Sequence, residues 1–222
     1  MEALFHPEDS SEEQVSGPRH PSPLALSRRF GKDPVRVKEV PSLLLKERIV
    51  FVPPAINDEV ANFVVALLLY LESQDTSKDI HMYINCHGSL DGNFYYGLGI
   101  YDTMQCLKAE IATYCVGVAQ GVAAALLAGG TKGKRFCLPH AQVVLHQPYS
   151  AARGQASDID ILAREIVRQR QLFHEIMSKH TNKSGEEIRQ DADRRRYMTA
   201  QQALEYGLVD EIIYPDELGK NE

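Results

Sequence analysis

Hydrophobic and polar positions change their spacing several times along this chain, and the changes predict alternating strands and helices. Apolar residues repeat at helical spacing over residues 60–72, just after Asn57, a residue suited to cap a helix. Residues 49–52 form a short run of strand-forming side chains. The same patterns predict further strands at 80–84, 111–116, 142–145 and 209–214, and helices at 97–107, 122–128, 157–181, 185–190 and 200–206, with a helical turn at 42–48. This alternation is typical of an α/β fold with largely parallel strands.

The predicted helix at 157–181 stands out by its length. It is rich in charged residues, and apolar residues such as Ile159, Leu162 and Ile166 recur along one side. Because it is longer than most helices of globular proteins, we expect it to project from the domain and to pack against another subunit.

Residues 1–40 differ in composition from the rest of the chain. They combine several prolines with an acidic patch and a basic patch, and apolar residues are too sparse to form a core. We expect a flexible or partner-ordered arm at 1–40, one folded domain at 41–214 and a short tail at 215–222.

Composition narrows the class of protein further. Of the 222 residues, 44% are hydrophobic, which supports a core, and the net charge of −6 argues against nucleic-acid binding. No apolar run is long enough to span a membrane. Residues 1–9 lack a secretion signal and are more acidic than a typical transit peptide. The cysteines, which form no CxxC pair, are expected to be buried thiols in a reducing compartment: Cys86, Cys106, Cys115 and Cys137.

A series of short motifs occurs in a fixed order along the folded part. They are LLKERIV at 44–50, YIN at 83–85, IYDTM at 100–104, GTKGKRF at 130–136, HQP at 146–148, GQASDI at 154–159 and EYGLVD at 205–210. In this order they resemble the ClpP (caseinolytic) serine proteases over about residues 41–214. The resemblance implies a ClpP/crotonase-like α/β fold of repeated β-β-α units, with 157–181 as its projecting handle helix.

Two of the family's three catalytic positions hold unsuitable residues. His146 matches the family's general base, and counting back 25 residues to the family's serine position reaches Gly121. The family's acid position is occupied by Arg195. A serine triad needs a nucleophilic oxygen, an imidazole and a carboxylate, so only the imidazole remains. We also expect the positive charge of Arg195 to oppose protonation of His146.

The family's oxyanion loop is altered as well. Its Ser-Pro-Gly-Gly run is replaced by residues that include Gly88 and Ser89, and the segment that leads to Gly97 is about three residues longer than the family's. With Val122, these residues occupy the oxyanion-loop positions. The changes together predict that peptidase chemistry has been lost.

Other sources of chemistry receive less support. Cys86 or Ser89 could serve as a displaced nucleophile, although buried thiols are usually inert. His81 and His87 lie near Cys86 and Asp91, but their spacing fits no zinc pattern, so we expect surface or loop residues and no metal.

Two further segments remain ambiguous. Residues 129–134 look like a phosphate loop but lack the GxxxxGK[ST] spacing, and the resemblance makes them a turn between a helix and a strand. The aromatic cluster 94–96 could fill the vacated cleft, contact a neighbouring subunit or pack onto its own domain.

The resemblance implies two stacked seven-membered rings fed by an AAA+ unfoldase of the Clp/Hsp100 type. We expect a non-catalytic, ClpR-like subunit without cofactors, in mixed heptameric rings with catalytic ClpP-type and other ClpR-type subunits. An accessory or chaperonin-like cap is a further expected partner, and the chloroplast stroma or a cyanobacterial cytoplasm is the expected compartment. The alternatives are an active peptidase with a displaced nucleophile, an acyl-CoA enzyme of the crotonase fold, and a regulatory module that docks an unfoldase through 1–40.

Overall fold

The computed structural model describes residues 40–89, 92–151 and 153–214. The chain divides into two compact units, Met1–Glu47 and Arg48–Glu222. In the shorter unit the described element is α2 (Val40–Lys46), where a helical turn was predicted. The predicted arm up to residue 39 and the tail 215–222 lie outside the described residues.

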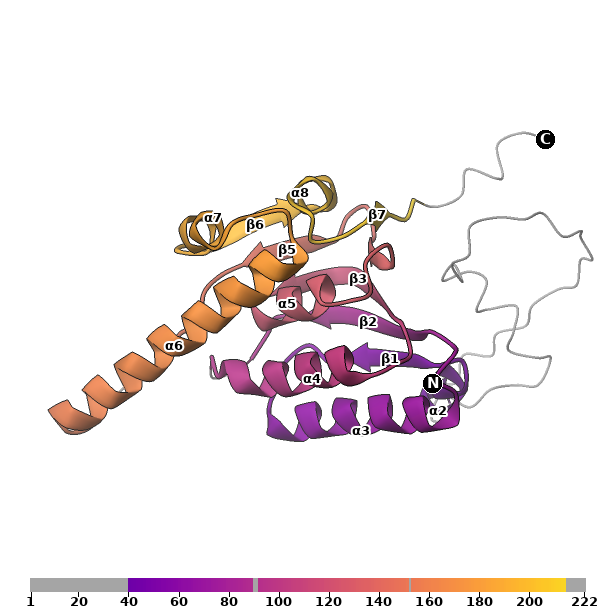
Figure 1. The fold of residues 1–222 in the computed structure, drawn as a ribbon, viewed down its shortest axis with the longest axis horizontal. Coiled ribbons are helices and arrows are strands. Elements are labelled where there is room, and N and C mark those ends of the chain that lie inside the picture. Colours follow the sequence, from indigo (N-terminus) through magenta and orange to yellow (C-terminus); the bar gives the residue numbers. More distant parts are fainter. Residues whose placement is uncertain (1–39, 90–91, 152, 215–222) are drawn as a thin grey trace, which may run out of the picture. The chain divides into compact units, whose positions relative to one another are not determined.

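The longer unit is built on a seven-stranded sheet, counted over the described residues. Its strands are β1 (Ile49–Val52), β2 (Ile80–Cys86), β3 (Ile111–Gln120), β4 (Arg135–Cys137), β5 (Gln142–Leu145), β6 (Arg196–Thr199) and β7 (Glu211–Ile212). The order is β1-β2-β3-β4-β7, and β5 pairs with both β3 and β6 (Figure 1). All these pairs are parallel except β5 with β6.

Helices lie between most consecutive strands, and parallel pairing requires such crossover connections. They are α3 (Asp58–Gln74), α4 (Phe94–Cys106), α5 (Val122–Ala128), α6 (Ala156–His180), α7 (Gly185–Asp191) and α8 (Ala200–Tyr206). Asn57 caps α3 as predicted, because its side chain accepts a hydrogen bond from the Val60 amide. The predicted α/β class is confirmed.

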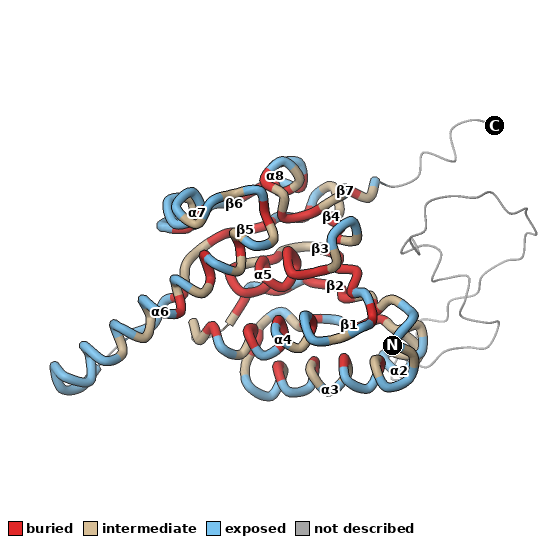
Figure 2. Tube along the Cα trace, viewed as in Figure 1, coloured by how far each residue is buried: buried red, intermediate tan, exposed pale blue. Residues whose placement is uncertain are grey.

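The core lies around β2, β3 and α5, which are mostly buried (Figure 2). Every residue of α5 is buried, and four of its seven residues are alanine, which lets the helix backbone pack closely. The aromatic side chains of Phe51, Tyr83, Tyr114 and Phe136 occupy paired positions on β1 to β4. Neighbouring rings stack with centroids 4.6–5.2 Å apart. This stack ties the four strands together in one register.

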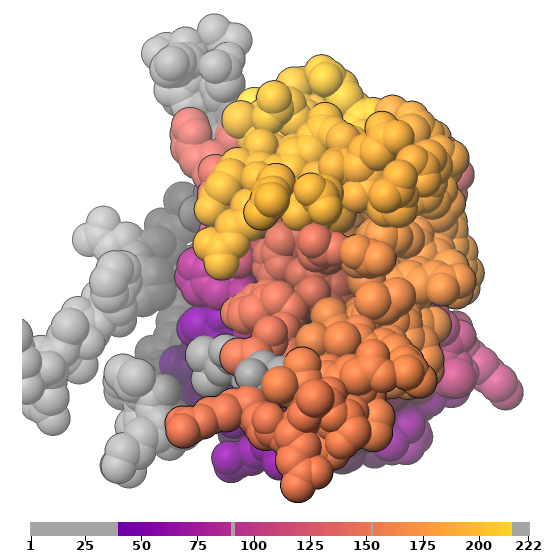
Figure 3. Space-filling view, turned by 90° about the vertical axis from the view of Figure 1, so that its left-hand side faces the viewer, coloured from indigo at the N-terminus to yellow at the C-terminus, as the bar shows by residue number. Residues whose placement is uncertain are grey.

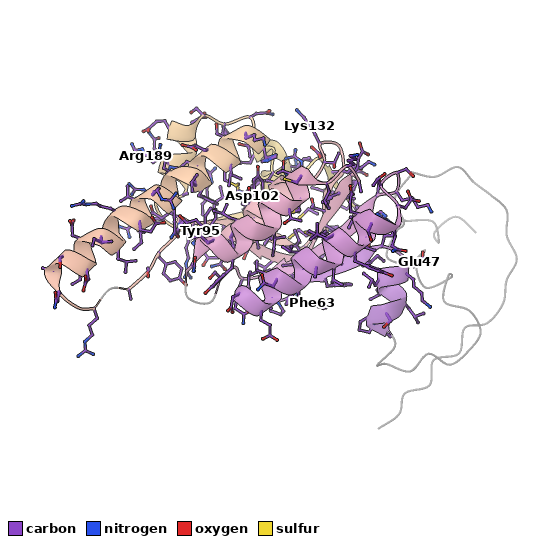
Figure 4. All side chains as sticks on the ribbon, turned by 60° about the horizontal axis from the view of Figure 1, so that its bottom comes forward. Glu47, Phe63, Tyr95, Asp102, Lys132 and Arg189 are labelled. Atoms are coloured by element: carbon purple, nitrogen blue, oxygen red, sulfur yellow. The ribbon has the colours of Figure 1, made fainter. Side chains whose placement is uncertain are left out.

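Helix α6 extends beyond the body of this unit (Figure 1). Its buried residues, from Gln169 to Met177, all belong to its second half, whereas residues 156–161 are exposed. Viewed from the projecting end, the orange atoms of α6 lie below the yellow atoms of α7, β6 and α8 (Figure 3). Tyr95 at the start of α4 donates a hydrogen bond to Glu165 of α6 at 2.5 Å (Figure 4). Phe94 packs edge-to-face on Phe173.

Several predictions about local structure were wrong. Strand β6 was missed because its four residues, RYMT, are too few to show a clear alternation, and two further arginines precede it. Cys106 was expected to be buried, but it is exposed at the end of α4. His81 was expected in a loop or on the surface, but it lies half-buried in β2 with Nδ1 3.0 Å from the Tyr114 hydroxyl. The other three cysteines are buried, as expected.

Candidate functional site

Gly121 forms a sharp turn between a strand and a helix. Strand β3 ends at Gln120 and α5 begins at Val122, so one residue makes the change of direction. Its φ of 57° and ψ of −116° are strained for a residue with a side chain. The Gly121 amide donates to the carbonyl of Val144 at 2.9 Å, which fixes the turn against β5. Serine hydrolases present a nucleophile on this kind of strand-to-helix turn, and glycine occupies it here.

The pairing of β3 with β5 brings His146 to this turn. Gln120 is paired with Val144, so the residue that follows β5 by one position lies beside Gly121. A Cβ atom placed on Gly121 would lie 2.7 Å from His146 Nε2 and 2.8 Å from Cε1, closer than real Cβ atoms approach other heavy atoms. The imidazole therefore occupies part of the space that a serine side chain would need.

The hydrogen bonds of His146 define its tautomer. Nδ1 lies 3.0 Å from the carbonyl oxygen of Gln147, which can only accept, so Nδ1 carries the proton. Nε2 is then an acceptor in the neutral ring, and it is buried without a partner among the described residues. Burial lowers the pKa of His146; the Gln147 carbonyl opposes this effect, and the positive charge of Arg195 adds to the lowering. The site thus holds a neutral imidazole whose free nitrogen faces Gly121.

Arg195 lies close to His146 because of the antiparallel pairing of β5 with β6. Leu145 is paired with Arg196, so the residues just outside this pair, His146 and Arg195, lie at the same end. An open pocket of about 240 Å³ lies between them, lined by His146, Gln147, Tyr149, Ala192, Asp193, Arg194 and Arg195. Burial is the largest cause of the lowered pKa of His146, and the charge of Arg195 adds to it in the expected direction. Among the described residues the Nδ1 proton is held by the Gln147 carbonyl and not by a carboxylate.

The predicted oxyanion positions are occupied by internal contacts. Gly88 has a φ of +88°, and its amide donates to the Cys86 sulfur at 3.3 Å, while Ser89 forms an isolated bridge with Ile56. The Val122 side chain is buried against Gly97, where a Cβ would lie only 1.9 Å from Val122 Cγ2. The Gly88 amide is therefore already engaged by a sulfur acceptor.

The cleft beside Gly121 is nearly filled. Its remaining cavity measures about 20 Å³ and is lined by Gly88, Ser89, Gly92, Phe94, Gly121, Val122, His146, Pro148 and Tyr149. One water molecule needs at least roughly 10–15 Å³ of such space, so there is no room for a substrate side chain. Phe94 of the predicted aromatic cluster lines this cavity, whereas Tyr95 packs on α6. Of the longer segment, Leu90 and Asp91 lie outside the described residues.

Two residues that close the cleft were not foreseen from the sequence. Tyr149 lies against His146, with ring centroids 6.0 Å apart. Gly92 approaches Tyr149 so closely that a Cβ on Gly92 would lie 2.0 Å from the Tyr149 carbonyl oxygen. The close approach depends on the positive φ of Gly92, which is a property of the folded backbone and could not be read from the sequence.

Cys86 has the character of a structural thiol. It is fully buried, and burial raises its pKa to about 11. A thiol in this state is a poor nucleophile at neutral pH. Ser89 lines the cavity next to His146, so the hypothesis of a displaced nucleophile rests mainly on that hydroxyl.

The segment 129–134 serves the fold. Gly133 donates its amide to Asp210 at 2.7 Å, and Lys134 pairs with Asp79 and Glu110. Asp210 also accepts two hydrogen bonds from the buried Arg135 guanidinium. Two motifs of the predicted family, GTKGKRF and EYGLVD, therefore meet in one ion pair between Arg135 and Asp210.

Within 40–89, 92–151 and 153–214 there is no group of three or more histidine, cysteine or acidic side chains arranged to hold a metal ion. Asp91, which belonged to the metal-site hypothesis, lies outside that part of the chain. No helix in the described part is both long and apolar enough to cross a membrane.

The fold and the site define a protein of the serine-hydrolase type in which the strand-to-helix turn carries glycine. Residues 31–216 match the family model of the Clp protease. Curated relatives from three strains of Dehalococcoides mccartyi are each 50% identical over 182 residues, which is 82% of this chain and 90% of the relative. Each is named as an ATP-dependent Clp protease proteolytic subunit. This chain belongs to the Clp protease family.

Proposed function

We propose that this chain is a non-catalytic, ClpR-type structural subunit of an ATP-dependent Clp protease. In this proposal it fills positions in mixed heptameric rings beside catalytic ClpP-type subunits and other ClpR-type subunits. An AAA+ unfoldase feeds the assembled core, and an accessory or chaperonin-like cap contacts it. The chloroplast stroma is the proposed compartment, with a cyanobacterial cytoplasm as the alternative.

The observation that carries this proposal is the state of the turn at Gly121. The backbone has the strained geometry of a nucleophile-bearing turn, yet the residue there has no side chain, and His146 lies in the vacated space. Without an oxygen or sulfur at this position, no covalent intermediate can form there. Arg195 at the acid position and the engaged Gly88 amide support the same interpretation.

Exposed apolar side chains support the assembly part of the proposal. Ile159, Ile161 and Val167 on α6 are 41%, 65% and 51% exposed. On α3, Phe63 is 61% exposed and points away from the body of the domain (Figure 4). Large apolar side chains exposed on one chain are typical of surfaces that are covered in an assembly. Retained assembly surfaces beside an incomplete site are what a structural subunit requires.

The rival hypothesis is an active peptidase with a displaced nucleophile. The curated relatives are named as proteolytic subunits, so family membership alone does not separate the two hypotheses. The two differ in measurable activity and in covalent labelling of Ser89 by a serine-reactive phosphonate.

The test is native purification of the tagged chain with its partners, followed by native mass spectrometry and peptidase assays of the isolated and assembled forms. We expect a mixed core of about fourteen subunits and no hydrolysis by the isolated chain. We also expect phosphonate labelling of partner subunits only. A homo-oligomer of this chain that cleaves peptides, or labelling of Ser89, would refute the proposal.

A location test is independent of the activity test. Fractionation of the source cells, with detection of this chain beside a stromal marker, should place it in the plastid stroma. Enrichment in any fraction other than the stroma or, in a cyanobacterium, the cytoplasm would contradict the proposed compartment.

A further inference from the structure

The pocket between His146 and Arg195 has a positive charge that the structure does not neutralise. Arg195 is exposed and forms no hydrogen bond or ion pair with the described residues. Arg194 is 95% exposed, and its Nε lies 3.7 Å from the Asp193 carboxylate, a loose contact. Asp193 is the one carboxylate among the lining residues, so two guanidinium groups face one acid.

The remaining wall of the pocket offers few free acceptors. The carbonyl of Ala192 accepts from the Gln147 amide at 3.2 Å, and the carbonyl of Asp193 accepts from the Gln147 side chain at 3.2 Å. His146 is neutral, and its Nδ1–H is engaged by the Gln147 carbonyl. The groups left to bind a ligand are therefore mainly the guanidinium donors, which favour an anion.

From this arrangement we propose that the pocket binds the carboxylate of a peptide C-terminus. Guanidinium groups recognise carboxylates through paired, charge-assisted hydrogen bonds. The volume of about 240 Å³ is smaller than the pockets that hold drug-sized ligands, roughly 300–1,000 Å³. It suits one terminal residue and its carboxylate, not a longer segment of chain.

This inference deepens the proposed function and rests on it. In a protease core each hydrolysis by a catalytic subunit releases a new peptide carboxylate inside the chamber. A subunit that cannot cleave, but carries Arg195 where the catalytic subunits carry an acid, would retain such products. The position of the catalytic acid thus becomes part of a pocket that binds the product. In a subunit that keeps the acid, the same pocket would repel a carboxylate.

The experiment compares two forms of one short peptide, labelled at its N-terminus, with either a free C-terminal carboxylate or a C-terminal amide. Each is titrated into the full chain at low salt, and binding is followed by fluorescence anisotropy. We expect the carboxylate form to bind about tenfold more tightly than the amide, because a hydrogen bond to a charged group contributes about that factor. Added salt should weaken the binding of the carboxylate form selectively.

Variants test whether Arg195 causes the preference for the carboxylate form of the peptide. Arg195→Ala should remove the preference for the carboxylate, and Arg195→Lys should keep part of it, since lysine retains the charge but loses the paired donors. Arg189→Ala is the matched control, because it removes the same charge from an exposed position on α7. It should leave the preference unchanged. All four proteins should give the same circular dichroism spectrum, since both arginines are exposed.

Three outcomes would overturn the inference: equal binding of the two peptides, no binding of either, or a preference that survives Arg195→Ala. Loss of assembly in Arg195→Ala with unchanged peptide binding would instead assign the arginine to a subunit contact. The recovered peptide is weighed by mass spectrometry after each titration. Cleavage of the peptide would count against the non-catalytic function, whereas an intact but unbound peptide would count against the pocket alone.

Discussion

Restoring a serine at Gly121 should destabilise the protein without restoring proteolysis. The substitution Gly121→Ser places a Cβ 2.7 Å from His146 Nε2, so the imidazole has to shift by several tenths of an ångström. It also places a side chain at a φ of 57° and ψ of −116°. Backbone strain of this kind costs about 1–3 kcal/mol. A cost of about 2 kcal/mol corresponds to a fall in Tm of about 4–8 °C for a domain of this size.

The expected activity of Gly121→Ser depends on position 195, the other altered position of the family's triad. A serine placed beside His146 lacks a carboxylate, since Arg195 stands at the acid position. Removing the acid of a serine triad lowers kcat about ten-thousandfold. We therefore expect Gly121→Ser to remain inactive toward a fluorogenic peptide. Gly121→Ser combined with Arg195→Asp should also remain inactive, because the cleft of about 20 Å³ beside residue 121 has no room for a substrate side chain.

The assays are thermal unfolding and peptide hydrolysis, each with a matched control. Gly99→Ser makes the same chemical change on α4, where a Cβ would meet no atom within 4 Å. Because serine is a better helix former than glycine, the control should be unchanged or slightly more stable. If Gly121→Ser matches the control in stability, the strain argument is wrong. If the single variant cleaves peptides as fast as a catalytic subunit, the argument from Arg195 is wrong.

The remaining predictions concern stability and thiol chemistry. Burial lowers the pKa of His180 to about 4 in the folded protein. In the unfolded chain this histidine binds a proton already as the pH falls below about 6.5, so protonation favours the unfolded state. Stability should therefore decline by up to about 3 kcal/mol between pH 6.5 and 4, and His180→Gln should flatten the Tm–pH curve in that range. Asp210→Asn leaves the buried Arg135 without its counter-charge and should cost about 3–5 kcal/mol in denaturant unfolding. A loss below 1 kcal/mol would show that this pair is dispensable. Under native conditions a maleimide should label Cys106 quickly, whereas Cys86 should react only after unfolding. Rapid labelling of Cys86 would revive the hypothesis of a displaced nucleophile.

Periodicity alone predicted most of the elements. The strand 49–52, the helix 122–128, the strand 142–145 and the helix 200–206 have the predicted bounds in the structure. These segments are short and apolar on the buried side, and glycine, proline or helix-capping residues adjoin several of their ends. Strand β6 was not predicted because an edge strand paired on one side needs little apolar sequence, and it begins with an arginine.

Part of the candidate site could be predicted from the sequence, and part could not. The residues at the three family positions could be read by counting along motifs, because a missing side chain or a reversed charge is a property of the sequence. The closed cleft could not be read in this way. It depends on the local contact of Tyr149 with His146 and on the approach of Gly92 to Tyr149, a contact between residues far apart in the chain.

The sequence by itself determined the family, the alternating elements and the chemical identity of the residues at positions 121, 146 and 195. Only the tertiary structure decided that His146 lies in the space of the missing side chain, that its free nitrogen faces inward, and that two arginines face an open pocket. The physical reason is that side-chain chemistry and local periodicity depend only on the order of residues along the chain. Cavities, by contrast, depend on strand register, here β3 on β5 and β5 on β6.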